Sequence, residues 1–155
     1  MDAERYLMQV QKYNRIIQNK LEEKEQWLAM ATNITARMGG ERVQASGSQQ
    51  RMADAVVEAE SIGEKITKAI NDMLVKRNEI IETLEELDVQ GYEILYKMYV
   101  GKVVAKKDGI LRTDYLSTKE IASDMFKTES WVRYERKKAI AELQKILDER
   151  EKEVN

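Results

Sequence analysis

The amino-acid sequence predicts an all-α protein in which a long, coiled-coil-like helical hairpin is followed by a C-terminal helix-turn-helix. Three observations support this fold class. The 155 residues contain no proline, so no residue removes a backbone donor from a long helix. Apolar residues recur at steps of three and four along two long segments. Near the C-terminus, a helix-capping pattern starts a short helix that a turn separates from a longer one.

The first predicted helix covers residues 3–31. Its apolar residues lie on one helical stripe, which Asn14 and Lys24 interrupt: Leu7, Val10, Tyr13, Ile17, Leu21 and Leu28. At a rise of about 1.5 Å per residue, this helix would be about 40 Å long. Because helix propensity alone stabilises such an element poorly, we expect it to pack against a partner surface.

The segment from Asn33 to Gln50 interrupts the apolar periodicity. It contains residues that favour turns and linkers, namely Gly39, Gly40, Ser46, Gly47 and Ser48. We therefore predict a loop over residues 33–50.

A second long helix is predicted over residues 51–88, with near-heptad apolar spacing. The stripe consists of Met52, Val56, Ala59, Ile62, Ile66, Ile70, Met73, Ile80, Leu84 and Leu87. Gly63 lies on the apolar side and costs about 1 kcal/mol relative to alanine, which favours a close helix crossing there. The two helices either fold back as an antiparallel hairpin or pair between two chains, and the pattern leaves both open. Residues 1–88 form the first predicted domain.

Residues 89–155 form the second predicted domain. Beyond Asp88 we expect a short amphipathic helix that ends at Gly101, with the apolar residues Tyr92, Ile94, Leu95, Met98 and Tyr99. The segment from Lys102 to Thr113 places Asp108 and Gly109 between two aliphatic runs. This pattern fits either a small basic β-hairpin, which would be a wing that contacts DNA, or an irregular surface loop.

Ser117 to Glu120 is a capping box, which starts a helix. Ile121, Ala122 and Met125 would form the inner face of that helix. A tight turn over residues 126–128 follows, and Thr128 would cap a longer helix over residues 129–151. A short helix, a short turn and a long helix are typical of a helix-turn-helix.

Composition argues against an enzyme. The chain has no cysteine and no histidine, which removes thiolate nucleophiles, imidazole bases and the commonest zinc ligands. We therefore expect no catalytic residues, no metal and no cofactor. No apolar run approaches the roughly 20 residues of a membrane span, and no signal-peptide pattern follows the N-terminus. We expect a cytoplasmic protein with no membrane partner.

Charge is distributed unevenly along the chain, although the formal net charge is only -2. Residues 51–88 contain 5 basic and 10 acidic side chains, whereas residues 97–138 contain 11 basic and 6 acidic ones. A basic segment around a helix-turn-helix favours DNA binding by the C-terminal part.

The C-terminal part resembles region 4 of bacterial sigma factors, which reads the -35 promoter element. The matching residues are Glu120, Ile121, Ala122, Val132, Ala139 and Leu143. The whole chain looks like the RinA- and ArpU-type late transcription activators of Gram-positive phages. Residues 34–36 and 41–47 are similar to the interhelical loop of that family, whereas residues 102–113 look longer than its connection. The resemblance implies activation of phage late genes in the bacterial host's cytoplasm, with host RNA polymerase as a partner.

Helical geometry predicts which side chains of the second helix face DNA. With Val132 as the buried reference and about 100° per residue, Ala139, Leu143 and Ile146 face inward, and Arg136 lies near the core side. The opposite side presents Ser130, Arg133, Tyr134 and Lys137 to bases, and Lys127 and Lys138 are better placed for phosphates. The full predicted DNA-binding set is Lys119, Lys127, Thr128, Ser130, Arg133, Tyr134, Lys137 and Lys138. Alternatively, the basic cluster of this helix is only a solvated face, and its members are Arg133, Arg136, Lys137 and Lys138.

These patterns favour a sequence-specific regulator that binds double-stranded DNA. The alternative is a small terminase-like packaging protein, which also joins a DNA-binding domain to oligomerising helices. Both readings allow a homo-oligomer. A coiled-coil adaptor without a DNA role does not explain the uneven charge.

Overall fold

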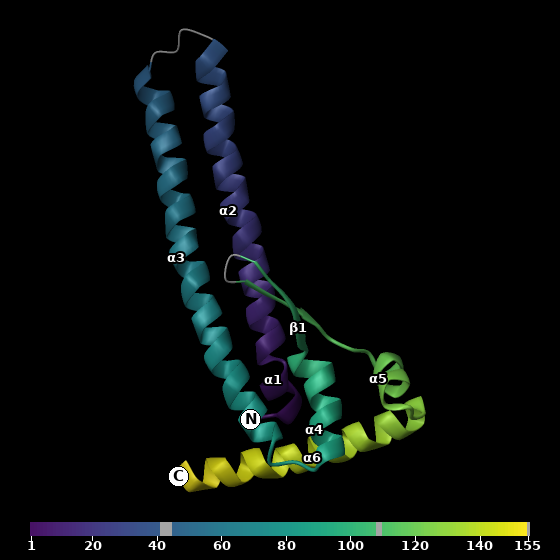
Figure 1. The fold of residues 1–155 in the computed structure, drawn as a ribbon. Helices are drawn as coiled ribbons and strands as arrows, with labels where there is room; N and C mark the ends of the chain where they lie inside the picture. Colours follow the sequence, from purple (N-terminus) through teal and green to yellow (C-terminus); the bar gives the residue numbers. More distant parts are fainter. Residues whose placement is uncertain (41–44, 108–109, 155) are drawn as a thin grey trace. The chain divides into compact units, whose positions relative to one another are not determined.

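The computed structural model describes residues 1–40, 45–107 and 110–154. They form helices and one two-stranded antiparallel sheet (Figure 1). The predicted all-α fold with a small β-hairpin is therefore confirmed. The elements in chain order are α1 (Ala3–Leu7), α2 (Gln9–Gly40), α3 (Ala45–Leu84), α4 (Val89–Leu95), the π-helix η1 (Tyr96–Val100), β1 (Lys102–Lys107), β2 (Ile110–Asp114), α5 (Thr118–Met125) and α6 (Glu129–Val154).

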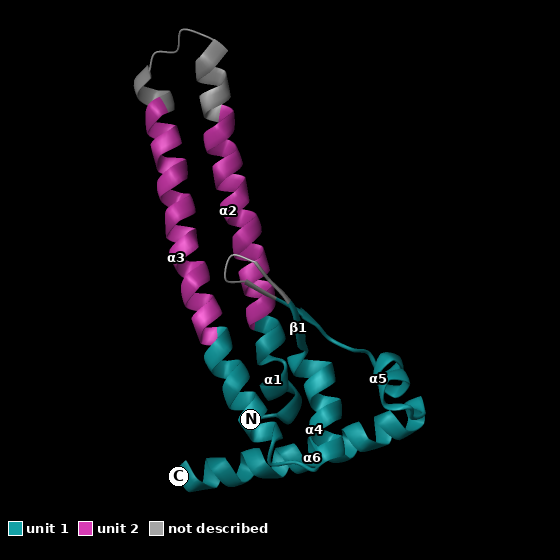
Figure 2. Cartoon of the chain, viewed as in Figure 1, with its two compact units in different colours: residues 1–12, 73–155 teal, residues 13–72 magenta. Residues whose placement is uncertain are grey.

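Backbone contacts divide the chain into two compact units (Figure 2). Residues 13–72 form one unit, which we call the hairpin unit. Residues 1–12 and 73–155 form the other, which we call the terminal unit. The N-terminus and the end of α3 thus group with the C-terminal residues. The division into domains 1–88 and 89–155 stays a prediction.

The loop predicted over residues 33–50 is wrong for most of its length. α2 continues to Gly40 and α3 begins at Ala45, while residues 41–44 lie outside the described residues. Glycine costs only about 1 kcal/mol in a helix relative to alanine, and serine costs less. Because the segment has no proline, no residue in it blocks the helical backbone.

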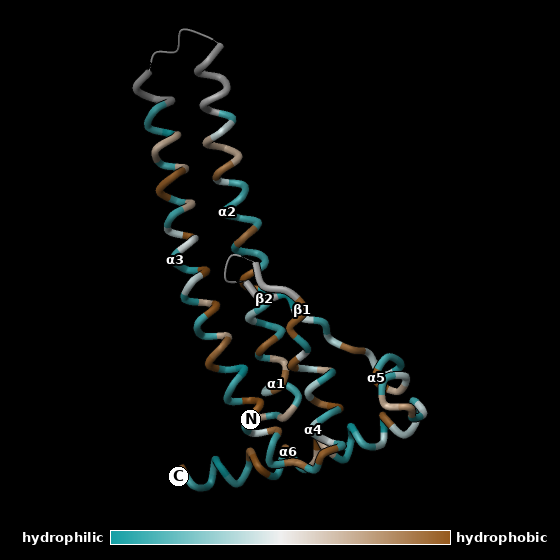
Figure 3. Tube along the Cα trace, viewed as in Figure 1, coloured by the Kyte–Doolittle hydropathy of each residue, from teal (hydrophilic) through white to brown (hydrophobic). Residues whose placement is uncertain are grey.

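The hairpin unit consists of parts of α2 and α3, and its buried residues have the spacing of a coiled coil. Its buried side chains recur at alternating steps of four and three along α3, namely Ala55, Ala59, Ile62, Ile66 and Ala69, and α2 contributes Ile17 and Ala31. Figure 3 shows hydrophobic stretches alternating with hydrophilic ones along both helices. Two stripe assignments were wrong. Val56 and Leu28 are 39% and 44% exposed, whereas Ala55 is buried and Trp27 half-buried. A coiled-coil seam is narrower than the apolar stripe of a surface helix, so only one of two adjacent residues is buried in it.

Gly63 makes room for a side chain and not for a helix backbone. A Cβ built there would lie 3.3 Å from Nζ of Lys24. Lys24, which interrupts the apolar stripe of α2, is half-buried opposite this glycine. The close helix crossing expected at Gly63 is therefore replaced by space for a lysine.

The terminal unit has a core that joins distant parts of the chain. Buried residues come from α1, the start of α2, the end of α3, α4, η1 and α6, including Leu7, Val10, Leu84, Leu95 and Leu143. A buried hydrogen bond of 2.9 Å links the hydroxyls of Tyr6 and Thr83. Arg150 donates to the Thr83 hydroxyl at 2.8 Å. The N-terminal residues are thus part of the surface on which α6 rests.

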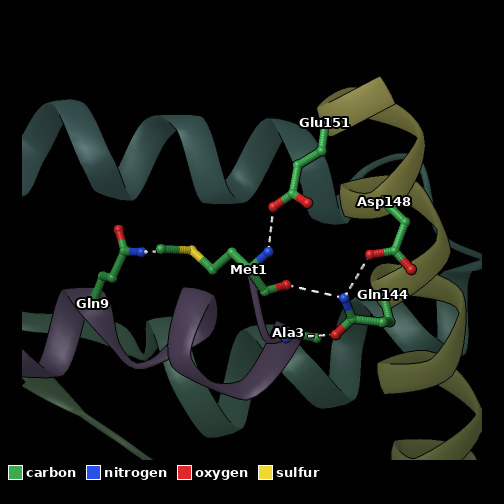
Figure 4. A network of polar contacts seen from close by, with 6 residues as sticks. All are labelled: Met1, Ala3, Gln9, Gln144, Asp148 and Glu151. Carbon is green, nitrogen blue, oxygen red and sulfur yellow. Dashed lines mark hydrogen bonds and ion pairs between the residues drawn. The ribbon is translucent and has the colours of Figure 1, made fainter. Parts of the chain in front are cut away.

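A polar network fixes α1 against α6 (Figure 4). Oε1 of Gln144 accepts a hydrogen bond from the Ala3 backbone N–H at 2.8 Å. Its Nε2 donates to the Met1 carbonyl at 2.9 Å and to Asp148 at 3.0 Å. The Met1 amino group forms an ion pair with Glu151. The Gln144 side chain therefore forms hydrogen bonds with both a backbone N–H and a backbone carbonyl at the start of the chain.

The short helix predicted between Asp88 and Gly101 is present as α4 and η1, and its second part is a π-helix. Its last carbonyls are satisfied outside the regular helical pattern. Tyr96 O accepts from Gly101 N at 2.8 Å, Lys97 O from Leu116 N at 3.0 Å, and Met98 O from the Gln11 side chain at 3.3 Å. Because each carbonyl has a donor, the wider π turn leaves no unpaired carbonyl among these three.

The segment after Gly101 forms a β-hairpin, which confirms the first of the two structures proposed for it. β1 and β2 pair antiparallel, from Lys102 opposite Asp114 to Lys107 opposite Ile110, with an irregularity between Val103 and Ala105. The expected turn at residues 108–109 lies outside the described residues.

Candidate nucleic-acid interface

The helix-turn-helix begins with the capping box that the sequence predicts. The Ser117 hydroxyl accepts from the Glu120 backbone N–H at 3.2 Å, and the Glu120 carboxylate accepts from the Ser117 N–H at 3.4 Å. α5 then runs from Thr118 to Met125. Both orphan donors at this helix start are therefore satisfied locally.

The turn between the two helices is a Schellman motif. The backbone N–H of Lys127 donates to Ala122 O at 2.9 Å, and that of Phe126 to Ser123 O at 3.4 Å. Phe126 adopts the left-handed conformation, with φ 57° and ψ 42°. Thr128 then caps α6, because its hydroxyl accepts from the Trp131 N–H at 3.1 Å. The short helix, turn and long helix predicted from the sequence are all present.

A small apolar cluster holds the helix-turn-helix on α4. It consists of the buried residues Ile94, Ile121, Ala122 and Val132, with Met98, Leu116, Met125 and Trp131 packed at its edge. This cluster fixes the start of α6 from behind and leaves its opposite side exposed. Trp131 therefore packs at the edge of the cluster that supports the start of α6.

The inward side of α6 agrees with the helical geometry. Val132, Ala139 and Leu143 are buried as predicted, whereas Ile146 is only half-buried. The sequence reasoning missed two buried residues of this side, Glu135 and Leu147. Glu135 lies three residues after Val132 on the same face, but its charge argued against burial.

The outward side of the start of α6 carries the predicted base-reading residues. Ser130, Arg133, Tyr134 and Lys137 are all exposed, and Tyr134 is 68% exposed. Within residues 1–40, 45–107 and 110–154, neither Arg133 nor Lys137 forms an ion pair. Two cations, a phenol and a hydroxyl therefore point to solvent from one helix face.

The other lysines of the predicted DNA-binding set, of which Lys127 and Lys138 are predicted to contact phosphates, differ in their surroundings. Lys119 is exposed in the first turn of α5. Lys127 lies over the ring of Trp131, with Nζ 5.2 Å from the ring centroid. Lys138 reaches toward Asp88, with Nζ and Oδ2 4.0 Å apart. Lys119 and Lys127 are thus at the helix-turn-helix, whereas Lys138 is directed toward the start of α4.

Arg136 has a structural role, in line with its predicted place near the core. Its guanidinium donates to Tyr99 and, at 2.8 Å, to Glu4. Burial lowers the pKa of Arg136, but the hydrogen bonds to Tyr99 and Glu4 outweigh that effect and leave the pKa above its ordinary value. Arg136 therefore connects α6 to α1 and η1.

An ion pair positions α5, and the sequence reasoning missed it. Nζ of Lys97 in η1 lies 2.7 Å from Oδ2 of Asp124 and 3.4 Å from the Glu93 carboxylate. The hydrogen bond to Asp124 raises the pKa of Lys97, and the same bond lowers the pKa of Asp124. The two partners lie 27 residues apart in the sequence. No local pattern indicates such a pair.

The first half of α6 is basic and the second half is acidic. Residues 129–140 contain four basic and two acidic side chains, whereas residues 141–154 contain three basic and five acidic ones. The helix dipole adds positive potential at the same end as the basic half. The start of α6 is therefore the part best suited to approach a polyanion.

Comparison of the chain with protein-family models, with curated proteins and with solved structures finds no match. Within the described segments, no helix combines the length and apolarity that a bilayer crossing requires.

Proposed function

We propose that this protein binds double-stranded DNA sequence-specifically through the helix-turn-helix formed by α5 and α6, and that its role is binding and not catalysis. One observation carries the proposal. The start of α6 is held from behind by an apolar cluster and presents Ser130, Arg133, Tyr134 and Lys137 together on its exposed side. A helix supported in this way can enter the major groove with its side chains toward base edges.

The exposed residues have chemistry that suits this task. Arg133 can donate two hydrogen bonds to guanine N7 and O6, which is worth about 1–3 kcal/mol of discrimination against other bases. Lys119, Lys127 and the Thr128 hydroxyl flank the start of α6 and would contact phosphates, with Lys138 further along the helix. On the β-hairpin, Lys102 and Arg112 are exposed and give the proposed wing its charge.

The biological setting is proposed from the resemblance to RinA- and ArpU-type activators. In that setting the protein activates late genes of a phage in the cytoplasm of its bacterial host. The acidic coiled half, residues 1–88, would then be the part that contacts host RNA polymerase or a second copy of the chain. The small terminase-like alternative shares the DNA-binding step and differs in its target and assembly.

The proposal can be tested with the full chain and a random duplex library. We expect repeated selection to enrich one sequence motif, with affinity that falls steeply as salt is added. Arg133→Ala should relax the base preference at one position, whereas Lys119→Ala should weaken all duplexes alike and reduce the salt slope by about one. Lys145→Ala is the matched control, because it removes an exposed lysine from the acidic half of α6.

Two results would count against this assignment. If selection enriches no motif and binding does not depend on salt, the protein is not a sequence-specific DNA-binding protein. If Lys145→Ala weakens binding as much as Lys119→Ala, the interface is not at the helix-turn-helix. Enrichment of packaging-site DNA by a ring-shaped oligomer would favour the terminase-like alternative.

A further inference from the structure

Phe126 occupies a position in the turn where a large side chain is unfavourable. It is the one residue other than glycine with positive φ within the described part of the chain. Glycine is the usual residue at this position of a Schellman motif, because a Cβ in the left-handed region is strained. Folding therefore gives no reason for phenylalanine at this position.

The Phe126 ring is also almost fully exposed. It is 94% accessible, the highest value among the large apolar side chains that the structure describes. An exposed aromatic ring gains no burial energy in the free protein. A strained and exposed residue at such a site is better explained by a contact that forms on binding.

The surroundings of Phe126 favour an anionic partner. Its chain neighbour Lys127 is exposed. α6 begins three residues after Phe126, so the positive end of the helix dipole lies close by, and Arg133 is exposed on its second turn. The ring itself has no hydrogen-bonding atom and is suited to contact with an apolar group. A partner that combines negative charge with an apolar group fits both features, and DNA is such a partner.

We propose that the Phe126 ring contacts the 5-methyl group of a thymine at the edge of the bound DNA site. In the major groove the base edges present donors, acceptors and a single apolar group, which is the thymine methyl. This inference rests on the proposed DNA-binding function and adds an element of specificity to it. Phe126 would thus select thymine at a position outside the bases read by Arg133.

The test uses the full chain and the duplex that it enriches from a random library. Each thymine of that duplex is replaced in turn by deoxyuridine, which lacks only the methyl group. We expect one replacement to weaken binding of the parent about four-fold, the equivalent of one buried methyl group. The same replacement should not change binding by Phe126→Gly. Val75→Ala, which shortens an exposed apolar side chain on α3, should keep the parent's profile.

Folding does not confuse the result, because glycine relieves the left-handed strain and should raise the midpoint of thermal unfolding. If Phe126→Gly and the parent respond alike to every deoxyuridine, the inference is wrong while DNA binding stands. Equal weakening of the thymine and deoxyuridine duplexes by Phe126→Gly would place the ring on the sugar-phosphate backbone and also overturn the thymine contact. If the parent enriches no duplex, the proposed function fails and this inference fails with it.

Discussion

A Cβ atom built on Gly91 would lie 3.0 Å from Cβ of Ala139, so α4 and α6 approach each other as closely as two helices with small residues allow. The same Cβ would lie 3.0 Å from Oδ1 of Asp88, which accepts a 2.7 Å hydrogen bond from the Gly91 N–H. This contact sets the distance between the helix that supports the helix-turn-helix and the helix that carries the proposed base-reading residues.

Gly91→Ala should destabilise the protein. The added methyl group would contact the Ala139 side chain on α6 and the Asp88 carboxylate that caps α4. Neither group can move without disturbing its helix. We expect a loss of about 1–3 kcal/mol, as for other overpacked core positions. Thermal unfolding monitored by circular dichroism measures it.

Gly63→Ala is the matched control with the opposite expected sign. Its Cβ would meet only the flexible end of Lys24, at 3.3 Å. The lysine can move, and alanine favours a helix over glycine by about 1 kcal/mol. We therefore expect Gly63→Ala to be neutral or stabilising. Equal destabilisation by both variants would contradict the close approach of α4 and α6.

The N-terminal helix should stabilise the DNA-binding part. Leu7 is fully buried in the core that also contains Leu143 of α6. Leu7→Ala should cost about 2–5 kcal/mol and lower the fraction of molecules that bind DNA near the unfolding temperature. The exposed neighbour Met8 provides the control, since Met8→Ala should change the unfolding temperature little. Indistinguishable unfolding of the two variants would mean that α1 does not pack on α6.

These cases show which parts of the structure can be read from sequence. The capping box, the inward residues Val132, Ala139 and Leu143, and the exposed side of α6 follow from spacing within one helix. Local periodicity captures all of them. The docking of α1 on α6 does not, because it depends on a hydrogen bond between Ala3 and Gln144, which lie 141 residues apart, and on a core that Leu7 shares with Leu143. The Lys97–Asp124 pair is hidden for the same reason.

The loop error has a different cause. Residues 33–50 contain glycines and serines, which lower helix stability without forbidding the helix. This composition is typical of a loop, although only proline removes a backbone donor. The exchange of Val56 for Ala55 in the seam has another cause. Adjacent residues lie about 100° apart on a helix, and the position of the partner helix decides which of the two it covers.

The ion pair between Lys97 and Asp124 should make stability depend on acid. The pKa of Asp124 is lowered in the folded protein by its hydrogen bond to Lys97. Its contribution is therefore present above the unfolded-state pKa of about 3.9 and is lost as pH falls through the lower folded value. We expect the parent to lose more thermal stability than Asp124→Asn between about pH 6 and pH 3. The exposed Asp72→Asn, in the hairpin unit, should behave like the parent. A parallel decline for parent and Asp124→Asn would show that the pair does not stabilise α5.

The seam of the hairpin unit can be tested with two substitutions on α3. Ile66 is buried at a seam position, whereas Val57 is 61% exposed on the outside of the same helix. Ile66→Asp places a carboxylate in the apolar seam without a partner, which should cost several kcal/mol and lower the helical signal of the full chain. Val57→Asp adds the same charge in solvent and should leave the unfolding temperature nearly unchanged. Because both variants add one negative charge to an already acidic helix, their difference isolates burial from charge repulsion. Equal helical signal and equal unfolding temperatures for the two variants would rule out the packed seam.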